Sequence, residues 1–129
     1  MNSPIVVVAG AIAHENKWLI ARRREGKSMA GFWEFPGGKI EANESPAEAL
    51  EREIMEEMGI RVKTGSVLGT NLHHYPSVSV QLILVEAEYV SGEIRLSDHD
   101  AYAWVDSHAL KAYTLAEADV PFISLLCGK

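Results

Sequence analysis

The chain has 129 residues, 47% of them hydrophobic, which is enough for one buried core and predicts a single domain over residues 1–129. Its net charge of -6 and pI of about 5.3 argue against a nucleic-acid polymer as partner, because proteins that bind such polymers display basic surfaces. The sequence has no apolar run long enough to span a membrane, no leader peptide and one cysteine, which together predict a cytoplasmic protein.

The first predicted elements are two strands of a hairpin that ends in three arginines. Residues 5–13 are apolar and β-branched, and residues 18–23 return as a second strand after a short polar turn. Arg22, Arg23 and Arg24 end this strand. They form either a solvated strand end or a clamp for phosphate, since guanidinium groups pair well with phosphate oxygens.

A short strand and a glycine turn come next. A short strand is predicted for residues 32–35. Its aromatic side chains, Trp33 and Phe35, are expected to lie in the core rather than to stack on a ligand. Gly37 and Gly38 follow as the turn. Because glycine has no side chain, the backbone here can approach a metal ion or a phosphate group closely.

One helix is predicted over residues 46–58, with clear signals at both ends. Ser45 suits the N-cap, Pro46 suits the first helical position, and Glu48 completes a Ser-x-x-Glu capping box. Gly59 provides a left-handed C-terminal stop. One narrow face of the helix is apolar and must pack on the rest of the chain: Ala47, Leu50, Ile54 and Met58.

Another sector of this helix carries three glutamates: Glu53, Glu56 and Glu57. Residues 38–60 hold seven of the 18 acidic residues and two of the 12 basic ones, so the acidity of the chain is local. An ion pair between Glu48 and Arg52 is expected to point elsewhere and to leave the three carboxylates without partners. A solvated acidic face is the alternative, but uncompensated carboxylates at this spacing favour a site for Mg²⁺ or Mn²⁺.

In the second half of the chain the sequence predicts mainly strands, over residues 62–75, 77–90 and 101–105. His73 and His74 are candidate ligands, but adjacent strand residues face opposite sides of a sheet and cannot form one site. A short helix is expected from a cap at Asp106 to Tyr113. A C-terminal helix follows, for which Asp119 is in the position of a cap.

Residues 38–60 match a known motif at every fixed position. Gly38 is followed after five residues by Glu44, and seven residues later by the run Arg-Glu-Ile-x-Glu-Glu-x-Gly-Ile, which begins at Arg52. This pattern resembles the complete Nudix box, and the preceding run Trp-Glu-Phe-Pro-Gly-Gly-Lys resembles the MutT-like branch of that family. The resemblance implies an α/β fold, a Nudix α/β/α sandwich with a mixed sheet. It also implies hydrolysis of a nucleoside triphosphate to a monophosphate and pyrophosphate, as in nucleotide-pool sanitation.

The same resemblance implies roles for particular residues. The implied ligands of Mg²⁺, or of Mn²⁺ in its place, are the Gly37 carbonyl, Glu53, Glu56, Glu57 and Asp98, the last with a shorter side chain than the usual glutamate. The implied substrate-binding residues are Arg23, Phe35, Gly38 and Asp119. Glu53 is the first candidate for the general base, and Glu44 is the alternative because a glutamate that binds a cation keeps its ionised form. Arg52 is expected to orient Glu53 or a neighbouring carboxylate rather than to contact the substrate.

Asp119 departs from the asparagine of the best-known MutT-like enzyme. An ionised carboxylate only accepts hydrogen bonds, so it suits the amino group of cytosine, or two donors on a guanine edge, better than 8-oxoguanine. The sequence Leu-Ala-x-Ala-Asp-x-Pro around it also resembles the CTP pyrophosphohydrolase branch. The alternatives to an 8-oxo-dGTP diphosphatase are therefore a CTP or dCTP pyrophosphohydrolase, an ADP-ribose hydrolase and a non-catalytic Nudix binding module. In each case we expect a small nucleotide as partner and a monomer or weak homodimer, with neither nucleic acid nor membrane bound.

Overall fold

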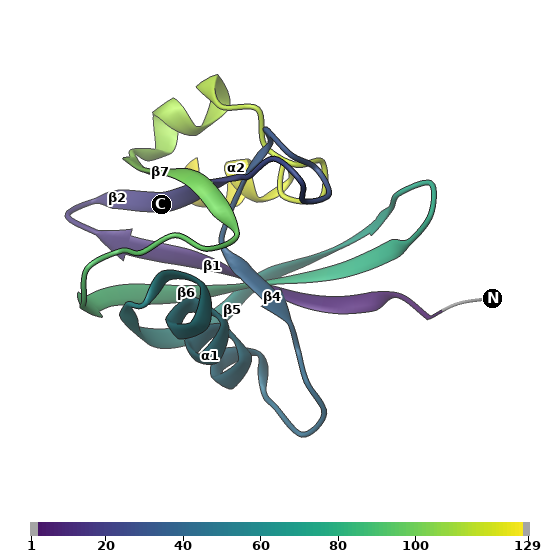
Figure 1. Cartoon of the computed structure of the whole chain (residues 1–129), viewed down its shortest axis with the longest axis horizontal. Helices are drawn as coiled ribbons and strands as arrows, with labels where there is room; N and C mark the ends of the chain where they lie inside the picture. The colour runs from purple at the N-terminus through teal and green to yellow at the C-terminus, as the bar shows by residue number, and fades with distance from the viewer. Residues whose placement is uncertain (1–2, 128–129) are drawn as a thin grey trace.

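The structure, a computed structural model, describes residues 3–127 of the chain. Within that range seven strands form one mixed sheet, with helical segments on both faces (Figure 1). The strands are β1 (Ile5–His14), β2 (Lys17–Arg23), β3 (Trp33–Glu34), β4 (Gly37–Lys39), β5 (Arg61–His74), β6 (Ser79–Ser91) and β7 (His99–Val105). The helical segments are α1 (Pro46–Met58), the 3₁₀ segment η1 (Ser107–Ala112) and α2 (Phe122–Cys127).

The predicted α/β/α sandwich with a mixed sheet is confirmed: α1 covers one face of the sheet, and η1 and α2 cover the other (Figure 1). The outer limits of the predicted domain, residues 1 and 129, lie outside the described residues. In the part of the chain that is described, no helix is long and apolar enough to cross a membrane.

Strand β1 organises the sheet because it pairs with three other strands, β6 along one edge and β4 and β2 along the other. One edge pairs in parallel with β6 along almost its whole length. The other edge pairs first with β4 and then, at the hairpin turn, with β2. The predicted hairpin is therefore present, but the predicted glycine turn is wrong, because Gly37 and Gly38 lie in β4 opposite Ala9 and Val8. Strands β2 and β4 diverge from one edge of β1, and the candidate site lies beside β4.

The two hydrophobic cores follow from the alternation of side chains along β1. Val8 and Ile12 point toward α1, whereas Ala9 and Ala11 point toward the side of α2. On α1 the fully buried residues are Ala49, Leu50, Ile54 and Met58, so Ala49 takes the place predicted for the half-buried Ala47. Burial of these side chains holds α1 against the sheet and fixes which of its glutamates face β4.

Helix α1 begins and ends where its sequence predicts. The Ser45 side chain accepts from the Glu48 N–H (3.1 Å), and the Glu48 carboxylate accepts from the Ser45 N–H (2.9 Å), which completes the capping box. Gly59 ends the helix with φ 70°. The predicted ion pair between Glu48 and Arg52 is wrong, because Glu48 turns back to the N-cap and Arg52 turns toward Glu44.

Candidate active site

The acidic face of α1 lies directly against β4. A Cβ atom placed on Gly38 would lie 2.0 Å from Glu53 Oε2, and one placed on Gly37 would lie 1.9 Å from the Val8 carbonyl oxygen. Gly37 has no room for a side chain, whereas a side chain on Gly38 would displace the Glu53 carboxylate. The group that lies closest to Gly38 is the Glu53 carboxylate, and the approach of this backbone to a metal ion or phosphate group stays a prediction.

Glu57 lies at the centre of a group of four acidic side chains. Burial raises the pKa of Glu57 to about 9, and a hydrogen bond with Glu53 and the charges of Glu53, Asp98 and Glu34 act in the same direction. Asp98 reaches this group because its segment runs along the end of α1, where Ser97 Oγ donates to the Glu57 carbonyl (3.2 Å). The Asp98 carboxylate also pairs with Lys27 Nζ at 3.2 Å.

Arg52 holds the outer side of this acidic group. Its Nε and Nη2 donate to both Glu44 oxygens (2.6 and 2.9 Å), and its Nη1 donates to Glu53 Oε1 (2.7 Å) and Glu56 Oε2 (3.2 Å). The expectation that the three helix glutamates lack basic partners is therefore wrong for Glu53 and Glu56. Hydrogen bonds from Arg52 lower the pKa of Glu44 to about 2, so Glu44 is ionised and weakly basic.

The donor set fits a divalent metal ion. It consists of carboxylate oxygens, the ligands that Mg²⁺ prefers, and burial, followed by the neighbouring carboxylates, favours the protonated form of Glu57. A bound cation would favour the ionised form instead. Within residues 3–127, no three such side chains already stand at metal-binding positions. Of the predicted ligands, Glu53, Glu57 and Asp98 come together, whereas the Glu56 side chain is 59% exposed and pairs with Arg52.

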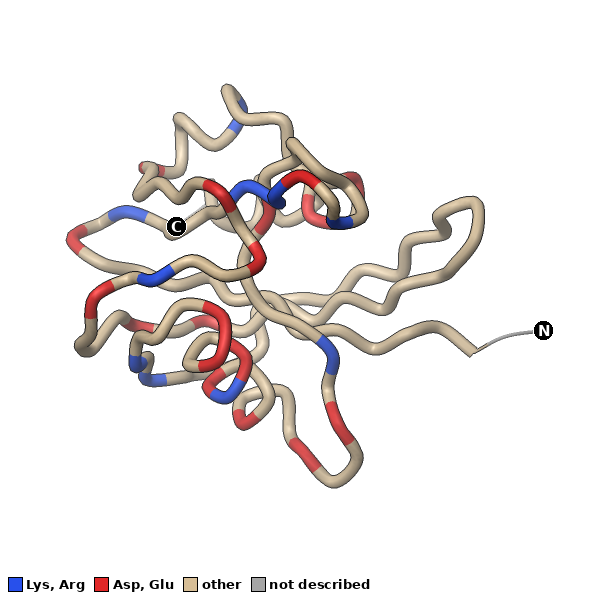
Figure 2. The backbone as a smooth tube through the Cα atoms, viewed as in Figure 1, with Lys and Arg blue, Asp and Glu red and all other residues tan. Residues whose placement is uncertain are grey.

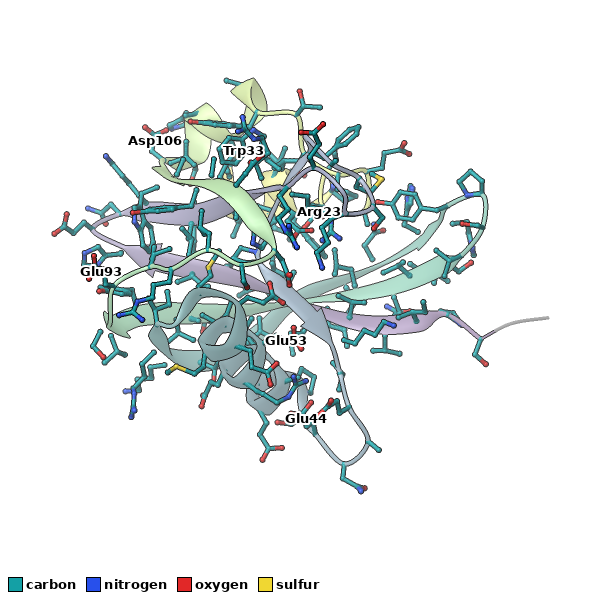
Figure 3. All side chains as sticks on the ribbon, in the orientation of Figure 1. Arg23, Trp33, Glu44, Glu53, Glu93 and Asp106 are labelled. Carbon is teal, nitrogen blue, oxygen red and sulfur yellow. The ribbon has the colours of Figure 1, made fainter. Side chains whose placement is uncertain are left out.

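Arg23 lies at the end of β2 and bonds to Glu34, one of the four acidic side chains of this group. Figure 3 shows Glu44 and Glu53 on the side of α1, and Arg23 beyond them on the side of β2. Arg23 Nη1 lies 3.3 Å from both Glu34 oxygens, and its Nε donates to the Ser28 carbonyl (2.5 Å). Its neighbour Arg22 instead bonds to Asp100 (2.7 Å), so only Arg23 of these two arginines contacts the acidic group around Glu57.

Glu34 and His99 have no predicted role from the sequence, yet they join the two sides of the site. His99 Nε2 pairs with Glu34 Oε2 at 2.8 Å, and the His99 side chain is completely buried. A signal for Glu34 was present: if Trp33 and Phe35 point into the core, the residue between them must point to the opposite side. No local signal identifies His99, because its partner lies 65 residues away.

Asp119 is buried behind Phe35. Its Oδ1 accepts from the Phe35 backbone N–H (3.3 Å), and only 5% of the residue is exposed. Burial, followed by the charge of Glu34, raises the pKa of Asp119 well above its ordinary value. The side chain does not cap α2, which begins at Phe122, where the N–H donates to the Asp119 carbonyl (3.0 Å). Phe35 is itself a core residue, as expected.

Charge is divided across the site. Acidic residues gather on α1 and on the loop before it, and a basic stretch ends β2 (Figure 2). The two candidate histidines are not part of this arrangement: His73 pairs with Glu117 (3.3 Å), and His74 contacts Ser79 (2.6 Å).

Residues 7–125 match the family model for the NUDIX domain. The chain belongs to the Nudix family. The CTP pyrophosphohydrolase of Escherichia coli K12 is 37% identical over 122 residues, which cover 92% of this chain and 88% of that relative. The 8-oxo-dGTP diphosphatase of Haemophilus influenzae is 32% identical over 126 residues, which cover 97% and 93%.

Solved structures agree with this assignment. The crystal structure of a MutT protein from Methanosarcina mazei superimposes with a TM-score of 0.84 at 31% identity, covering 99% of this chain and 94% of that one. This Nudix protein therefore belongs to the MutT-like hydrolases, as the sequence predicts. Nudix hydrolases generally require a divalent metal ion, usually Mg²⁺.

Proposed function

We propose that this Nudix hydrolase cleaves a nucleoside or deoxynucleoside triphosphate to the monophosphate and pyrophosphate. The observation that carries the proposal is the group of acidic side chains around Glu57, together with Arg23, which bonds to one member of that group, Glu34. Carboxylates on one side suit Mg²⁺, and a guanidinium on the other suits a phosphate. Phosphoryl transfer depends mainly on such positioning and charge neutralisation.

Glu53, Glu57, Asp98 and the Gly37 carbonyl would hold the metal ions, with Glu56 joining them when its side chain leaves Arg52. Bound Mg²⁺ supplies charge neutralisation at the phosphates and a more acidic water. Arg23 would bind a phosphate oxygen, and Glu34 and Ser28 orient its guanidinium for that contact. The absence of a side chain on Gly38 leaves room for the Glu53 carboxylate beside β4.

Glu53 is the better candidate for the general base. Arg52 orients its carboxylate from 2.7 Å, and Glu57 hydrogen-bonds to it. Glu44 is held at both oxygens by Arg52, and its pKa of about 2 makes it a poor proton acceptor at neutral pH. Arg52 thus acts by orienting Glu53 rather than by binding substrate.

The burial of Asp119 changes the expectation for the nucleobase. A protonated carboxyl group donates through its O–H and accepts through its carbonyl, as an asparagine amide does. Neutral Asp119 would therefore suit 8-oxoguanine, whereas the ionised form would suit the cytosine amino group. This supports 8-oxo-dGTP as the first candidate substrate, with CTP or dCTP as the second. The relatives reported above bear the names of both activities.

The intact box and the named relatives argue against the other two alternatives, ADP-ribose hydrolysis and a non-catalytic binding module. We expect a cytoplasmic protein that is a monomer or weak homodimer.

The test is a panel of 8-oxo-dGTP, CTP, dCTP, the common dNTPs and ADP-ribose, assayed with Mg²⁺ and scored separately for pyrophosphate and orthophosphate. Hydrolysis in ¹⁸O-labelled water identifies the attacked phosphorus, because the label enters the monophosphate or the pyrophosphate. Glu53→Gln should reduce turnover by about a hundredfold or more while the protein stays folded. Release of orthophosphate only, cleavage of ADP-ribose only, or an unchanged rate in Glu53→Gln would contradict the proposal.

A further inference from the structure

The segment that carries Asp119 has no regular secondary structure of its own, and neighbouring strands hold it in place. On one side it is joined to β3: the Trp33 N–H donates to the Thr114 carbonyl (2.9 Å), and the Ala116 N–H donates to the Trp33 carbonyl (2.8 Å). Asp119 itself contacts Phe35, the residue after β3. These contacts alone would leave the opposite side of the segment, at residues 117–118, without an anchor.

Strand β5 and the residue that follows it supply that anchor through three side chains on one face: Asn71, His73 and Tyr75, named here the β5 clasp. Asn71 Nδ2 donates to the Ala118 carbonyl at 3.0 Å, and the Ala118 N–H donates to the Tyr75 hydroxyl at 3.0 Å. His73 lies between them, 3.3 Å from the Glu117 carboxylate and 4.4 Å from the Tyr75 ring centroid. The alternate residue Leu72 is exposed on the other face.

The position of Ala118 explains why this anchor matters. Both backbone polar groups of Ala118 are bound by side chains, and its carbonyl belongs to the peptide bond that leads into Asp119. Ala118 is itself buried, so a shift of this peptide would move the Asp119 carboxyl relative to Phe35. A carboxyl group can discriminate between bases only if its donor and acceptor directions are fixed.

The Tyr75 hydroxyl is chemically suited to this role. Burial raises the pKa of Tyr75, so the hydroxyl keeps its proton. It accepts from Ala118 and retains one O–H to donate.

We propose that the β5 clasp sets nucleobase selectivity by holding Asp119 in position. Its members are positioning residues: they act through Asp119 and contribute nothing to metal binding or to the attacking water. The inference rests on the proposed function, because it requires a nucleotide whose base reaches Asp119.

The test compares Tyr75→Phe with Tyr102→Phe, which removes one hydroxyl from an exposed tyrosine on β7. The readout is the ratio of kcat/KM for 8-oxo-dGTP and CTP. Tyr75→Phe should change this ratio by about fivefold, the effect of one lost hydrogen bond, mainly through KM and with kcat for the better nucleotide within about twofold. Tyr102→Phe should leave the ratio unchanged. Asn71→Leu should change the ratio as Tyr75→Phe does, and it replaces Tyr75→Phe in the test if that variant does not fold.

A double-mutant cycle decides whether the clasp acts through Asp119. In an Asp119→Ala background, Tyr75→Phe should cause no further change in the ratio. The same fivefold change in both backgrounds, or no change in either, would overturn the clasp while leaving nucleotide hydrolysis intact. If Asp119→Ala alone does not alter the ratio, no selectivity depends on Asp119 and the clasp is also overturned. Failure of the wild-type protein to hydrolyse any nucleoside triphosphate would instead overturn the proposed function.

Discussion

Replacing Glu57 with glutamine should inactivate the protein and make it more stable. Glu57 is mostly buried beside other carboxylates, and its pKa is raised from 4.5 to about 9. Because the folded-state pKa lies above the unfolded-state value, protonated Glu57 contributes stability that is complete below pH 4.5 and is lost as the pH rises toward about 9. The amide N–H of glutamine can donate a hydrogen bond to Glu53, as the O–H of protonated Glu57 does, and glutamine stays uncharged at every pH.

The expected size of this effect follows from the shift. One pKa unit corresponds to about 1.4 kcal/mol, so the interval from 4.5 to neutral pH sets an upper limit of about 3 kcal/mol. Because the carboxyl group is partly exposed and water screens its charge, we expect Glu57→Gln to raise the free energy of unfolding by about 1–2 kcal/mol at neutral pH. In a domain of this size that corresponds to a rise in Tm of about 3–8 °C.

The assay is urea or thermal unfolding in EDTA at about pH 5 and about pH 8. The free energy of unfolding of Glu57→Gln should clearly exceed that of the wild type at pH 8, and the difference should be much smaller at pH 5. The control is Glu56→Gln, an exposed glutamate on the same helix, which should change stability by less than about 0.5 kcal/mol. Mg²⁺ should then stabilise the wild type more than Glu57→Gln. Equal stability of wild type and Glu57→Gln at both pH values, or a less stable variant at pH 8, would refute the reasoning.

Two further predictions concern the glycines of β4 and the pH dependence of selectivity. Gly38→Ala should lower kcat by about tenfold or more with the fold retained, because the new methyl group displaces only the Glu53 side chain. Gly37→Ala should instead destabilise the protein by several kcal/mol, because its methyl group meets the rigid Val8 carbonyl; denaturation and turnover measured on both variants distinguish the two outcomes. Selectivity for 8-oxo-dGTP over CTP should fall as the pH rises through the raised pKa of Asp119, since the neutral acid loses its donor. Asp119→Asn should remove this pH dependence, and a parallel pH profile in both proteins would contradict the assignment.

The local features of this protein could be predicted from the sequence because short-range rules govern them. The limits of α1 depend on Ser45, Glu48 and Gly59, which interact with backbone groups no more than four residues away. The same holds for the hairpin of β1 and β2, whose strands are joined by a short polar turn. The box spacing also predicted that Glu53 and Glu57 share a helix face, because this required only the geometry of one helix, whereas Glu56 of the same predicted group turns to Arg52.

Only the tertiary structure decided the partners and the protonation states of those side chains. Spacing along α1 allowed Arg52 to pair with Glu48, but the N-cap uses Glu48, and the loop before the helix brings Glu44 within reach of Arg52. The protons on Glu57 and Asp119 depend on burial by distant parts of the chain. Phe35 and Asp119 are 84 residues apart, and Tyr75 and Ala118 are 43 apart. No local pattern encodes such contacts, because they exist only after the sheet has assembled.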